Sequence, residues 1–373
     1  MEPHRVLVTG GTGFLGSAIV KALTEQKQYA VTVLDIKPPS SDMPSFPPVR
    51  YFQADVLNLE SVQKVFEETK PSIVVHTVGV SPIGSARYSQ DGKTALFEIN
   101  VNGTKNVLDA SRQNGVQAFV YTSSCTVVTD DVDHDYPNYD ETTQTGNATL
   151  IYGQSKVCPY INLHPNTDKQ KTAAENLVVS ANSTTFRTCA LRPSIIFGPG
   201  DIQGIPTIHA CIAKGETPFI VGSGTNLFDF VYVSNAADAH VLAIWNLLTS
   251  GSAAGQVFCI SNGEPVPFRD FCLAIWAEFD HAPSFEVRIP KSLAWVLGCF
   301  AGYVTWVTGT QATLSRGSVK DACGVRYANL EKAQRVLGYK PKVGLAEGVK
   351  MACQVISSFH SLPHLLTTCN AAL

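Results

Sequence analysis

The sequence has little charge and no concentration of positive charge. Only 16% of its 373 residues are charged, and the formal net charge is −3. A protein that binds nucleic acid through its phosphates presents a basic patch or stripe, and no basic run occurs here. The composition therefore argues against a nucleic-acid-binding protein.

Metal-binding and redox patterns are missing as well. None of the ten cysteines belongs to a C-x-x-C pair, and no group of cysteines and histidines has the spacing of a zinc site. The chain opens with the strand-like HRVLVTG rather than with an apolar signal segment. We therefore expect reduced thiols, no bound metal and a cytoplasmic location.

Long uncharged stretches are rare, with one exception at 293–309. This stretch, LAWVLGCFAGYVTWVTG, is at the short end of the length that a bilayer span needs. Its glycines and tryptophans equally suit a core helix over a substrate, or a helix that rests on a membrane surface. The three interpretations remain open.

Short β-branched runs alternate with amphipathic stretches through the first half of the chain. RVLVTG, AVTVLDI, VRYFQAD, SIVVHT and QAFVYTSS have the character of buried parallel strands, and RTCALRP and QVFCISNG of later ones. This alternation predicts an α/β fold, a Rossmann-type doubly wound parallel sheet. We expect a nucleotide-binding domain over 1–192 and a smaller, mostly helical substrate-binding lobe over 193–373, with 255–262 returning to the sheet.

A glycine-rich turn joins the first expected strand to the first expected helix. VLVTGGTGFLGSAIV places Gly10, Gly13 and Gly16 where side chains would block a tight turn, a pyrophosphate or helix packing. With Phe14 and Leu15 between them, these residues form the predicted cofactor turn.

Asp35 ends the second expected strand, where a carboxylate can accept hydrogen bonds from both hydroxyls of an adenine ribose. The same carboxylate repels a 2′-phosphate, so the pattern favours NAD over NADP, although the nearby Lys37 could tolerate a phosphate. Asp55 and Val56, after the third strand, are candidates to flank the adenine.

Tyr152 and Lys156 lie one helical turn apart in YGQSK, after a polar loop over 130–149. Oxidising a secondary alcohol requires a base for the hydroxyl proton, and a phenol with a pKa of about 10 must be made more acidic for that role. Lys156 and an oxidised nicotinamide would supply the positive charge. Ser124, at the end of YTSS, can hold the substrate oxygen, with Ser123 and Thr126 as close competitors.

Together, GGTGFLG, YTSS and YGQSK resemble the extended short-chain dehydrogenases/reductases. Later stretches, LRPSIIFGPGD, NLFDFVYVSNAADAHVLA and RYANLEKAQRVLGYKPKVGLAEGV, resemble the 3β-hydroxysteroid dehydrogenase branch, and within it the sterol-4α-carboxylate 3-dehydrogenases. The likeness extends over about Arg5 to Val355.

This resemblance implies catalysis by Ser124, Tyr152 and Lys156, with Pro193 where the backbone approaches the nicotinamide. It further implies oxidation of a 3β-hydroxyl group on a lipophilic sterol, triterpenoid or terpenoid hybrid, with decarboxylation where C4 carries a carboxylate. A homodimer and a place on the endoplasmic reticulum membrane, in contact through 293–309, are also implied. Two alternatives remain: another reductase or epimerase of the superfamily, and a catalytically impaired NAD-binding protein.

The second alternative arises because the expected catalytic helix is interrupted. VCPYINLHPNTDKQ, at 157–170, contains Pro159 and Pro165, and its removal leaves the continuous helical pattern IYGQSKKTAAENLVVSAN. One hypothesis is a translated short intron, since its codons can begin with GT and end with AG; a transcript that always retains them would contradict it. The other interpretation is a genuine loop.

Overall fold

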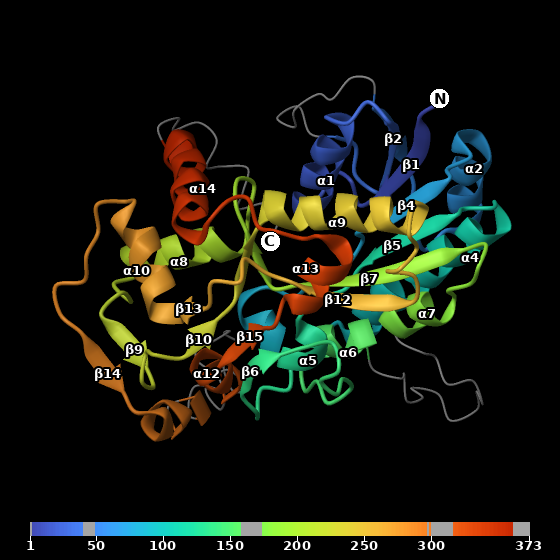
Figure 1. Cartoon of the computed structure of the whole chain (residues 1–373). Coiled ribbons are helices and arrows are strands. Elements are labelled where there is room, and N and C mark those ends of the chain that lie inside the picture. The colour runs from blue at the N-terminus through green and yellow to red at the C-terminus, as the bar shows by residue number, and fades with distance from the viewer. Residues whose placement is uncertain (1, 40–48, 158–173, 297, 300–315, 361–373) are drawn as a thin grey trace.

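The computed structural model describes residues 2–39, 49–157, 174–296, 298–299 and 316–360. A seven-stranded sheet lies at its centre, with the strand order β12-β7-β5-β4-β1-β2-β3 and every neighbouring pair parallel (Figure 1). The predicted doubly wound sheet is confirmed. Its strands are β1 His4–Thr9, β2 Tyr29–Asp35, β3 Arg50–Gln53, β4 Ile73–His76, β5 Ala118–Thr122, β7 Arg187–Pro193 and β12 Gln256–Ile260.

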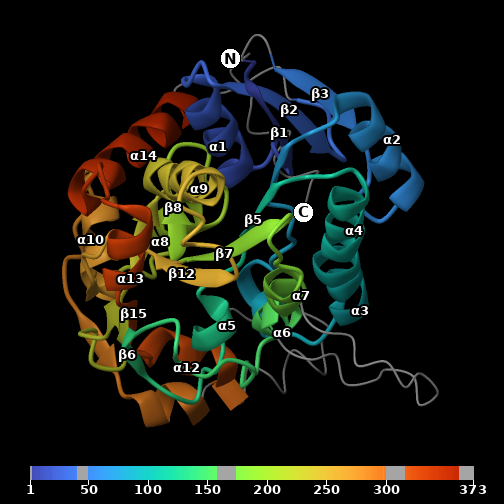
Figure 2. The same cartoon turned by 45° about the vertical axis from the view of Figure 1, so that its right-hand side comes forward.

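Alternate residues of each strand enter separate hydrophobic cores on the two faces of the sheet. Val6 and Val8 pack into one core, whereas Leu7 packs into the other. Helices α1 Phe14–Thr24, α9 Val233–Leu248 and α13 Glu331–Leu337 cover the first face, and α2 Leu59–Thr69, α4 Thr104–Gln113 and α7 Ala174–Ser180 cover the second (Figure 2). Segments from beyond residue 193 (α9, β12 and α13) therefore belong to this sandwich.

The strand order reverses between β1 and β4. From β1 the chain proceeds to β2 and β3 on one side, and then returns to β4 on the other. At such a switch point the connections diverge and leave a crevice outside the carboxyl ends of the strands. Gly10 follows β1 and Thr77 follows β4, so both lie at this crevice.

The chain over 93–113 forms three consecutive helical segments rather than one α-helix. They are α3 Lys93–Phe97, a π-helical segment η2 Glu98–Gly103 and α4. Gly115 ends the last of them with a φ of +71°. The wider π turn contains the buried Asn100, and such insertions are frequent at functional sites.

The C-terminal part is partly helical, and its short strands, which carry no readable periodicity, form small sheets, one of them together with β6 from the N-terminal part. A four-stranded sheet has the order β13-β10-β15-β6, and β11 pairs with β8 and β14 with β9. These strands are β6 Tyr136–Tyr139, β8 Ile195–Phe197, β9 Phe219–Val221, β10 Leu227–Phe228, β11 Phe230–Tyr232, β13 Val266–Pro267, β14 Val287–Ile289 and β15 Arg326–Ala328. The helices are α8 Gly204–Ala213, α10 Phe268–Ala277, α12 Arg316–Cys323 and α14 Leu345–His360. Since β6 lies inside the expected loop over 130–149, that prediction was wrong in part.

Within the described ranges, no helix is long and apolar enough to cross a membrane. Leu293 and Val296 are 51% and 56% exposed, but 297 and 300–309 lie outside the residues that the structure describes. Membrane contact through 293–309 therefore stays a prediction, as do the homodimer and the boundaries of the two lobes.

Candidate active site

The glycine turn between β1 and α1 is tightly closed. Gly10 has a φ of +75°, and a Cβ atom at Gly16 would lie 2.0 Å from the Gly10 carbonyl oxygen. Only glycine fits at position 16, because that contact is with backbone that cannot move aside. Gly13 is exposed and precedes Phe14, the first residue of α1, so free N–H groups of the helix face the crevice. This cradle has the shape and polarity that a pyrophosphate requires.

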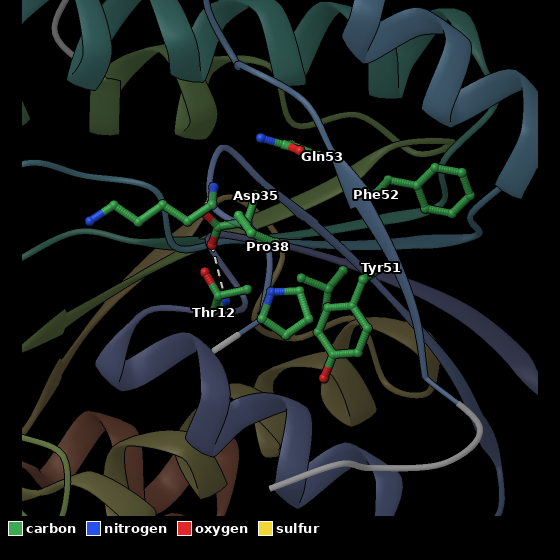
Figure 3. Close-up of a pocket in the computed structure, with 9 residues that line it drawn as sticks. Thr12, Asp35, Pro38, Tyr51, Phe52 and Gln53 are labelled. Atoms are coloured by element: carbon green, nitrogen blue, oxygen red, sulfur yellow. Dashed lines mark hydrogen bonds between the residues drawn. The ribbon is translucent and has the colours of Figure 1, made fainter. Parts of the chain in front are cut away.

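Asp35 lies at the rim of a cavity beside this turn (Figure 3). Its carboxylate accepts hydrogen bonds from the backbone N–H of Thr12, at 3.0 Å, and of Lys37, at 3.2 Å. The carboxylate is thus held in place with further lone pairs available to a ribose. The cavity is lined by Thr12, Val33, Asp35, Lys37, Pro38, Pro39, Tyr51, Phe52 and Gln53. At this rim the Asp35 carboxylate could accept hydrogen bonds from the hydroxyls of a ribose.

The other predicted cofactor residues occupy different positions. Leu15 is buried in the core beneath α1, and Phe14 packs near Gly200, where an added Cβ would lie 3.6 Å from its ring. Asp55 accepts a hydrogen bond from the Leu57 N–H at 2.9 Å. Neither Phe14 nor Leu15 lines the cavity of Figure 3.

Val56 is buried where helix η2 joins α4. A Cβ on Gly103 would come within 2.8 Å of its side chain. Neither Val56 nor Asp55 lines the cavity beside Asp35. Pro193 ends β7 in register with Ile260, and its carbonyl oxygen accepts a hydrogen bond from the Cys125 N–H at 3.0 Å.

Three hydroxyl side chains follow β5, and their surroundings differ. The Ser123 hydroxyl donates to Glu175 Oε2 at 2.6 Å and so lies on the α7 side of the sheet. The Thr126 hydroxyl is buried without a hydrogen-bond partner among the described residues. Of the three, only Ser124 acts on Tyr152, because its hydroxyl lowers the pKa of the phenol. The structure therefore brings Ser124 to the phenol.

Tyr152 and Lys156 both lie on helix α6, Ile151–Val157, on the side that faces the end of β5. The Lys156 ammonium lies 5.8 Å from the centre of the Tyr152 ring. Burial is the main cause that raises the pKa of Tyr152, and Asp130 and Cys125 raise it further, whereas the Ser124 hydroxyl and Arg87 lower it. Lys156 is not among these main causes, so the expected acidification of the phenol by Lys156 is not met in the protein alone.

Lys156 is only 2% exposed. Its Nζ donates to the Thr122 carbonyl oxygen at 3.2 Å, and Gly79 leaves room for it, since a Cβ there would lie 2.9 Å from Nζ. Burial lowers the pKa of Lys156 to about 8, although Glu175 opposes this shift. A buried lysine with few partners can still bind a polar ligand group in the crevice.

Sequence reasoning missed Asn100, which holds the segments around Lys156 together. Its amide binds the backbone of Val80 twice, accepting from N at 2.8 Å and donating to O at 3.0 Å. It also donates to the Ser155 hydroxyl at 2.9 Å, and Ser155 donates to the Tyr152 carbonyl at 2.7 Å. No local pattern marks this asparagine within a helical stretch.

A buried ion pair behind Ser124 was also missed. Arg192 on β7 donates twice to Glu175 on α7, at 2.7 and 3.0 Å. Two buried residues of opposite charge in otherwise apolar elements were the only signal in the sequence. The pair fixes α7 against β7 beside the site.

Helix α6 ends at Val157, and α7 begins at Ala174 in contact with it. The remainder of the predicted insertion, 158–170, lies outside the described residues. The buried faces of both helices point toward the sheet: Ser155 and Lys156 in α6, and Ala174, Glu175 and Val178 in α7. Tyr152 and Lys156 therefore lie in one helix, α6, and α7 packs against this helix although the interruption separates the two in the sequence.

Comparisons with known proteins place the chain in a family. The family model described as 3-beta hydroxysteroid dehydrogenase/isomerase family matches residues 7–291. The chain is 35% identical to the decarboxylating sterol-4-alpha-carboxylate 3-dehydrogenase of Schizosaccharomyces pombe, over 94% of this chain and 96% of that protein. The Mus musculus protein named as the same enzyme is 31% identical, over 97% and 92%.

Solved structures show the same fold at low identity. The UDP-glucose 4-epimerase of Thermus thermophilus, described as a complex with NAD, is 22% identical and aligns with a TM-score of 0.68. The alignment covers 95% of this chain and 99% of the epimerase. At this identity the likeness establishes the fold alone.

Proposed function

Because the chain belongs to the 3-beta hydroxysteroid dehydrogenase/isomerase family, we propose that it is an NAD-dependent dehydrogenase of a 3β-hydroxyl group. The proposed substrate is a sterol, a triterpenoid or a terpenoid hybrid. Relatives at 31–35% identity named as decarboxylating sterol-4-alpha-carboxylate 3-dehydrogenases support this substrate class. The observation that carries the proposal is the meeting of Ser124, Tyr152 and Lys156 at the sheet edge that also holds the glycine turn.

Tyr152 is the proposed base for the substrate hydroxyl. The Ser124 hydroxyl lies close enough to the phenol to lower its pKa, so an alcohol oxygen bound between the two would contact both an acceptor for its proton and a donor for its developing charge. Bound NAD would supply the hydride acceptor and a positive ring. The raised pKa of Tyr152 keeps the phenol protonated in the protein alone, so added positive charge is needed before it can act as a base.

Lys156 has two proposed roles. Its ammonium, anchored at the Thr122 carbonyl, contributes positive charge near Tyr152 and is available to hydrogen-bond a cofactor ribose. Gly10, Gly13, Gly16 and the α1 N-terminus would hold the pyrophosphate. Asp35 would accept the adenine-ribose hydroxyls, which supports NAD over NADP.

Decarboxylation requires no further catalytic group. Oxidation at C3 of a substrate with a C4 carboxylate produces a β-keto acid. The ketone then accepts the electron pair as carbon dioxide leaves, and the Ser124 hydroxyl can stabilise the resulting enolate oxygen.

Two alternatives remain. The epimerase folds among the structural neighbours are compatible with another reductase or epimerase activity. The interruption after Val157 is compatible with an impaired NAD-binding protein.

The test is NADH formation by the purified chain with a panel of 3β-hydroxysteroids, with and without a 4-carboxylate. We expect Tyr152→Phe to lower turnover at least about a hundredfold, because proton transfer loses its base while the ring still packs. Thermal stability and NAD binding of this variant should match the parent chain. Unchanged alcohol oxidation by Tyr152→Phe would refute the proposed mechanism.

A further inference from the structure

Asp130 is a fully buried carboxylate directly beside the catalytic helix. Its Oδ2 accepts a hydrogen bond from the Gly153 N–H at 2.9 Å, and Gly153 is the residue after Tyr152. A Cβ on Gly153 would lie 2.7 Å from the Asp130 Cβ and 2.5 Å from the Thr126 carbonyl oxygen. The glycine of YGQSK thus permits a close approach of Asp130 to the helix.

The backbone of Asp130 holds the segment that leads into α6. Its carbonyl oxygen accepts hydrogen bonds from the N–H and the hydroxyl of Thr149, both at 2.9 Å. Asp130 therefore binds the chain on both sides of Tyr152. A free N–H in the first turn of a helix is stabilised by a carboxylate acceptor, so this contact fixes the start of α6.

Arg87, from the η1 segment Gly84–Tyr88, completes the environment of Asp130. Its Nη2 donates to Asp130 Oδ1 at 2.7 Å, and its Nε donates to Asp321 Oδ2 at 3.1 Å. Asp321 lies on α12 and also accepts hydrogen bonds from Tyr88 and Arg326. Charged side chains thus connect α12 through Arg87 and Asp130 to the first turn of α6.

We propose that Asp130 is a positioning residue for Tyr152, held in place by Arg87, which α12 anchors in turn through Asp321. The inference rests on the proposed function, because it assigns Tyr152 as the base. Through its hydrogen bond to Gly153, Asp130 fixes the position and orientation of the Tyr152 phenol. The negative charge of Asp130 also disfavours the phenolate, and the positive charge of Arg87 weakens this effect.

The electrostatics agree with this role. Asp130 is the first charged group among the causes that raise the pKa of Tyr152, and Arg87 lowers it. Burial raises the pKa of Asp130 itself, whereas Arg87 opposes that shift. The titratable and charged groups around Tyr152 and Asp130, from every element packed against α6, are Cys125, Arg87, Asp321, Tyr121, Glu175, Lys156 and Lys93, which binds Gln154.

The test compares Asp130→Asn with Asp130→Ala. In Asp130→Asn the new amide oxygen can still accept from Gly153, while Arg87 keeps Asp321. We expect kcat at the plateau of its pH profile to stay within about threefold of the parent value. The acid limb of the profile should move to a pH lower by at least roughly half a unit, because a negative charge near the phenol is removed. In Asp130→Ala the acceptor is lost, and we expect kcat to fall about tenfold or more with KM for NAD within about twofold.

Asp131→Asn is the matched control, since it removes the same charge one residue away. Its carboxylate binds His134 and Tyr136 rather than α6. We expect this variant to keep both the kcat and the acid limb of the kcat–pH profile of the parent. If Asp130→Asn kept the acid limb of the parent, or if Asp130→Ala kept its kcat, the proposal would be overturned.

A second measurement does not depend on turnover. Hydrogen-exchange mass spectrometry of the peptide over 149–157 should show at least about tenfold faster exchange in Asp130→Ala than in Asp130→Asn or Asp131→Asn, while peptides over β1 and α1 stay unchanged. Equal exchange in all variants would refute the positioning role. Absence of alcohol oxidation by the parent, with the exchange difference present, would instead refute the proposed function.

Discussion

Two buried carboxylate–guanidinium pairs flank the proposed catalytic residues, and they are built in different ways. Glu175 and Arg192 are 2% and 4% exposed and belong to neighbouring elements of the sheet sandwich. Ser123 adds a third hydrogen bond to Glu175. This pair is enclosed within the Rossmann part of the chain.

The pair of Asp130 and Arg87 is open on one side. The Asp130 carboxylate is fully buried, but the Arg87 side chain is 22% exposed and shares its guanidinium with Asp321 of α12. One pair thus stabilises the sheet whose β5 leads to Ser124 and carries the Thr122 carbonyl that binds Lys156, and the other connects Tyr152 to the C-terminal part. The difference teaches that Tyr152, the proposed base, and Lys156, one helical turn away, are held in place by two separate ion pairs.

The largest expected effect comes from breaking the enclosed pair. Arg192→Met leaves the Glu175 carboxylate buried without its partner, which we expect to cost about 3–5 kcal/mol of unfolding free energy. The double variant Glu175→Gln/Arg192→Met should regain most of this loss, because no buried charge remains. Urea denaturation at about pH 7 measures both. Arg87→Met should cost clearly less, since the Arg87 side chain is 22% exposed and Asp321 keeps its contact with Arg326. An equal loss would contradict the contrast between the pairs.

A somewhat smaller effect concerns Lys156, whose protonated form is destabilised by burial and stabilised by Glu175. Its pKa is lowered from 10.5 to about 8 on folding, so the folded protein carries a cost of about 3 kcal/mol wherever both states are protonated, below pH 8. This cost fades as the pH rises from 8 to 10.5. We therefore expect Lys156→Met to be more stable than the parent at about pH 7, with the difference vanishing near pH 10.5, while catalysis is lost. Melting temperatures across this range test the sign, and a difference that grows with pH would contradict it.

The smallest expected effect concerns the interruption of the helix at 157–170, which lies between the carboxylates of the two ion pairs along the chain. Asp130 precedes it and Glu175 follows it. Removing 157–171 makes Glu175 the fourth residue after Lys156, on the same helical face. Removing 157–170, as the sequence pattern suggested, makes it the fifth residue, about 140° around the helix from Lys156 rather than about 40°. The buried positions of α6 and α7 favour the first deletion.

We therefore expect the 157–171 deletion to raise turnover about a hundredfold over this chain, or about 2.7 kcal/mol in activation free energy, because it stiffens the helix behind Lys156. The 157–170 deletion should gain less and melt at a lower temperature. The turnover numbers of the parent chain and of the two deletion variants, determined side by side, measure this. Equal turnover of all three would show that the interruption does not matter for catalysis.

Much of the site could be predicted because its signals are local. The glycines at 10, 13 and 16 and the position of Asp35 are set by the geometry of a single strand–turn–helix unit, and the structure closes that turn as expected. Tyr152 and Lys156 are one turn apart on one helix, so their proximity follows from the sequence. Parallel strands were also readable, since burial on both faces leaves continuous apolar runs.

Other features could not be predicted because they join distant segments. Arg87 meets Asp321 across 234 positions, and no periodicity encodes such a contact. The choice among Ser123, Ser124 and Thr126 depended on which side of the sheet end each hydroxyl faces. The small sheet that pairs β15 with β6 was missed for the same reason.

The sequence alone determined the kind of chemistry, because a glycine turn, a ribose-binding carboxylate and a Tyr/Lys helix each depend on residues that are neighbours along the chain. Only the tertiary structure decided how acidic the phenol and the lysine are. Their pKa values depend on burial and on charges that folding brings from α7, η1 and the end of β5, and desolvation has no representation in a linear pattern.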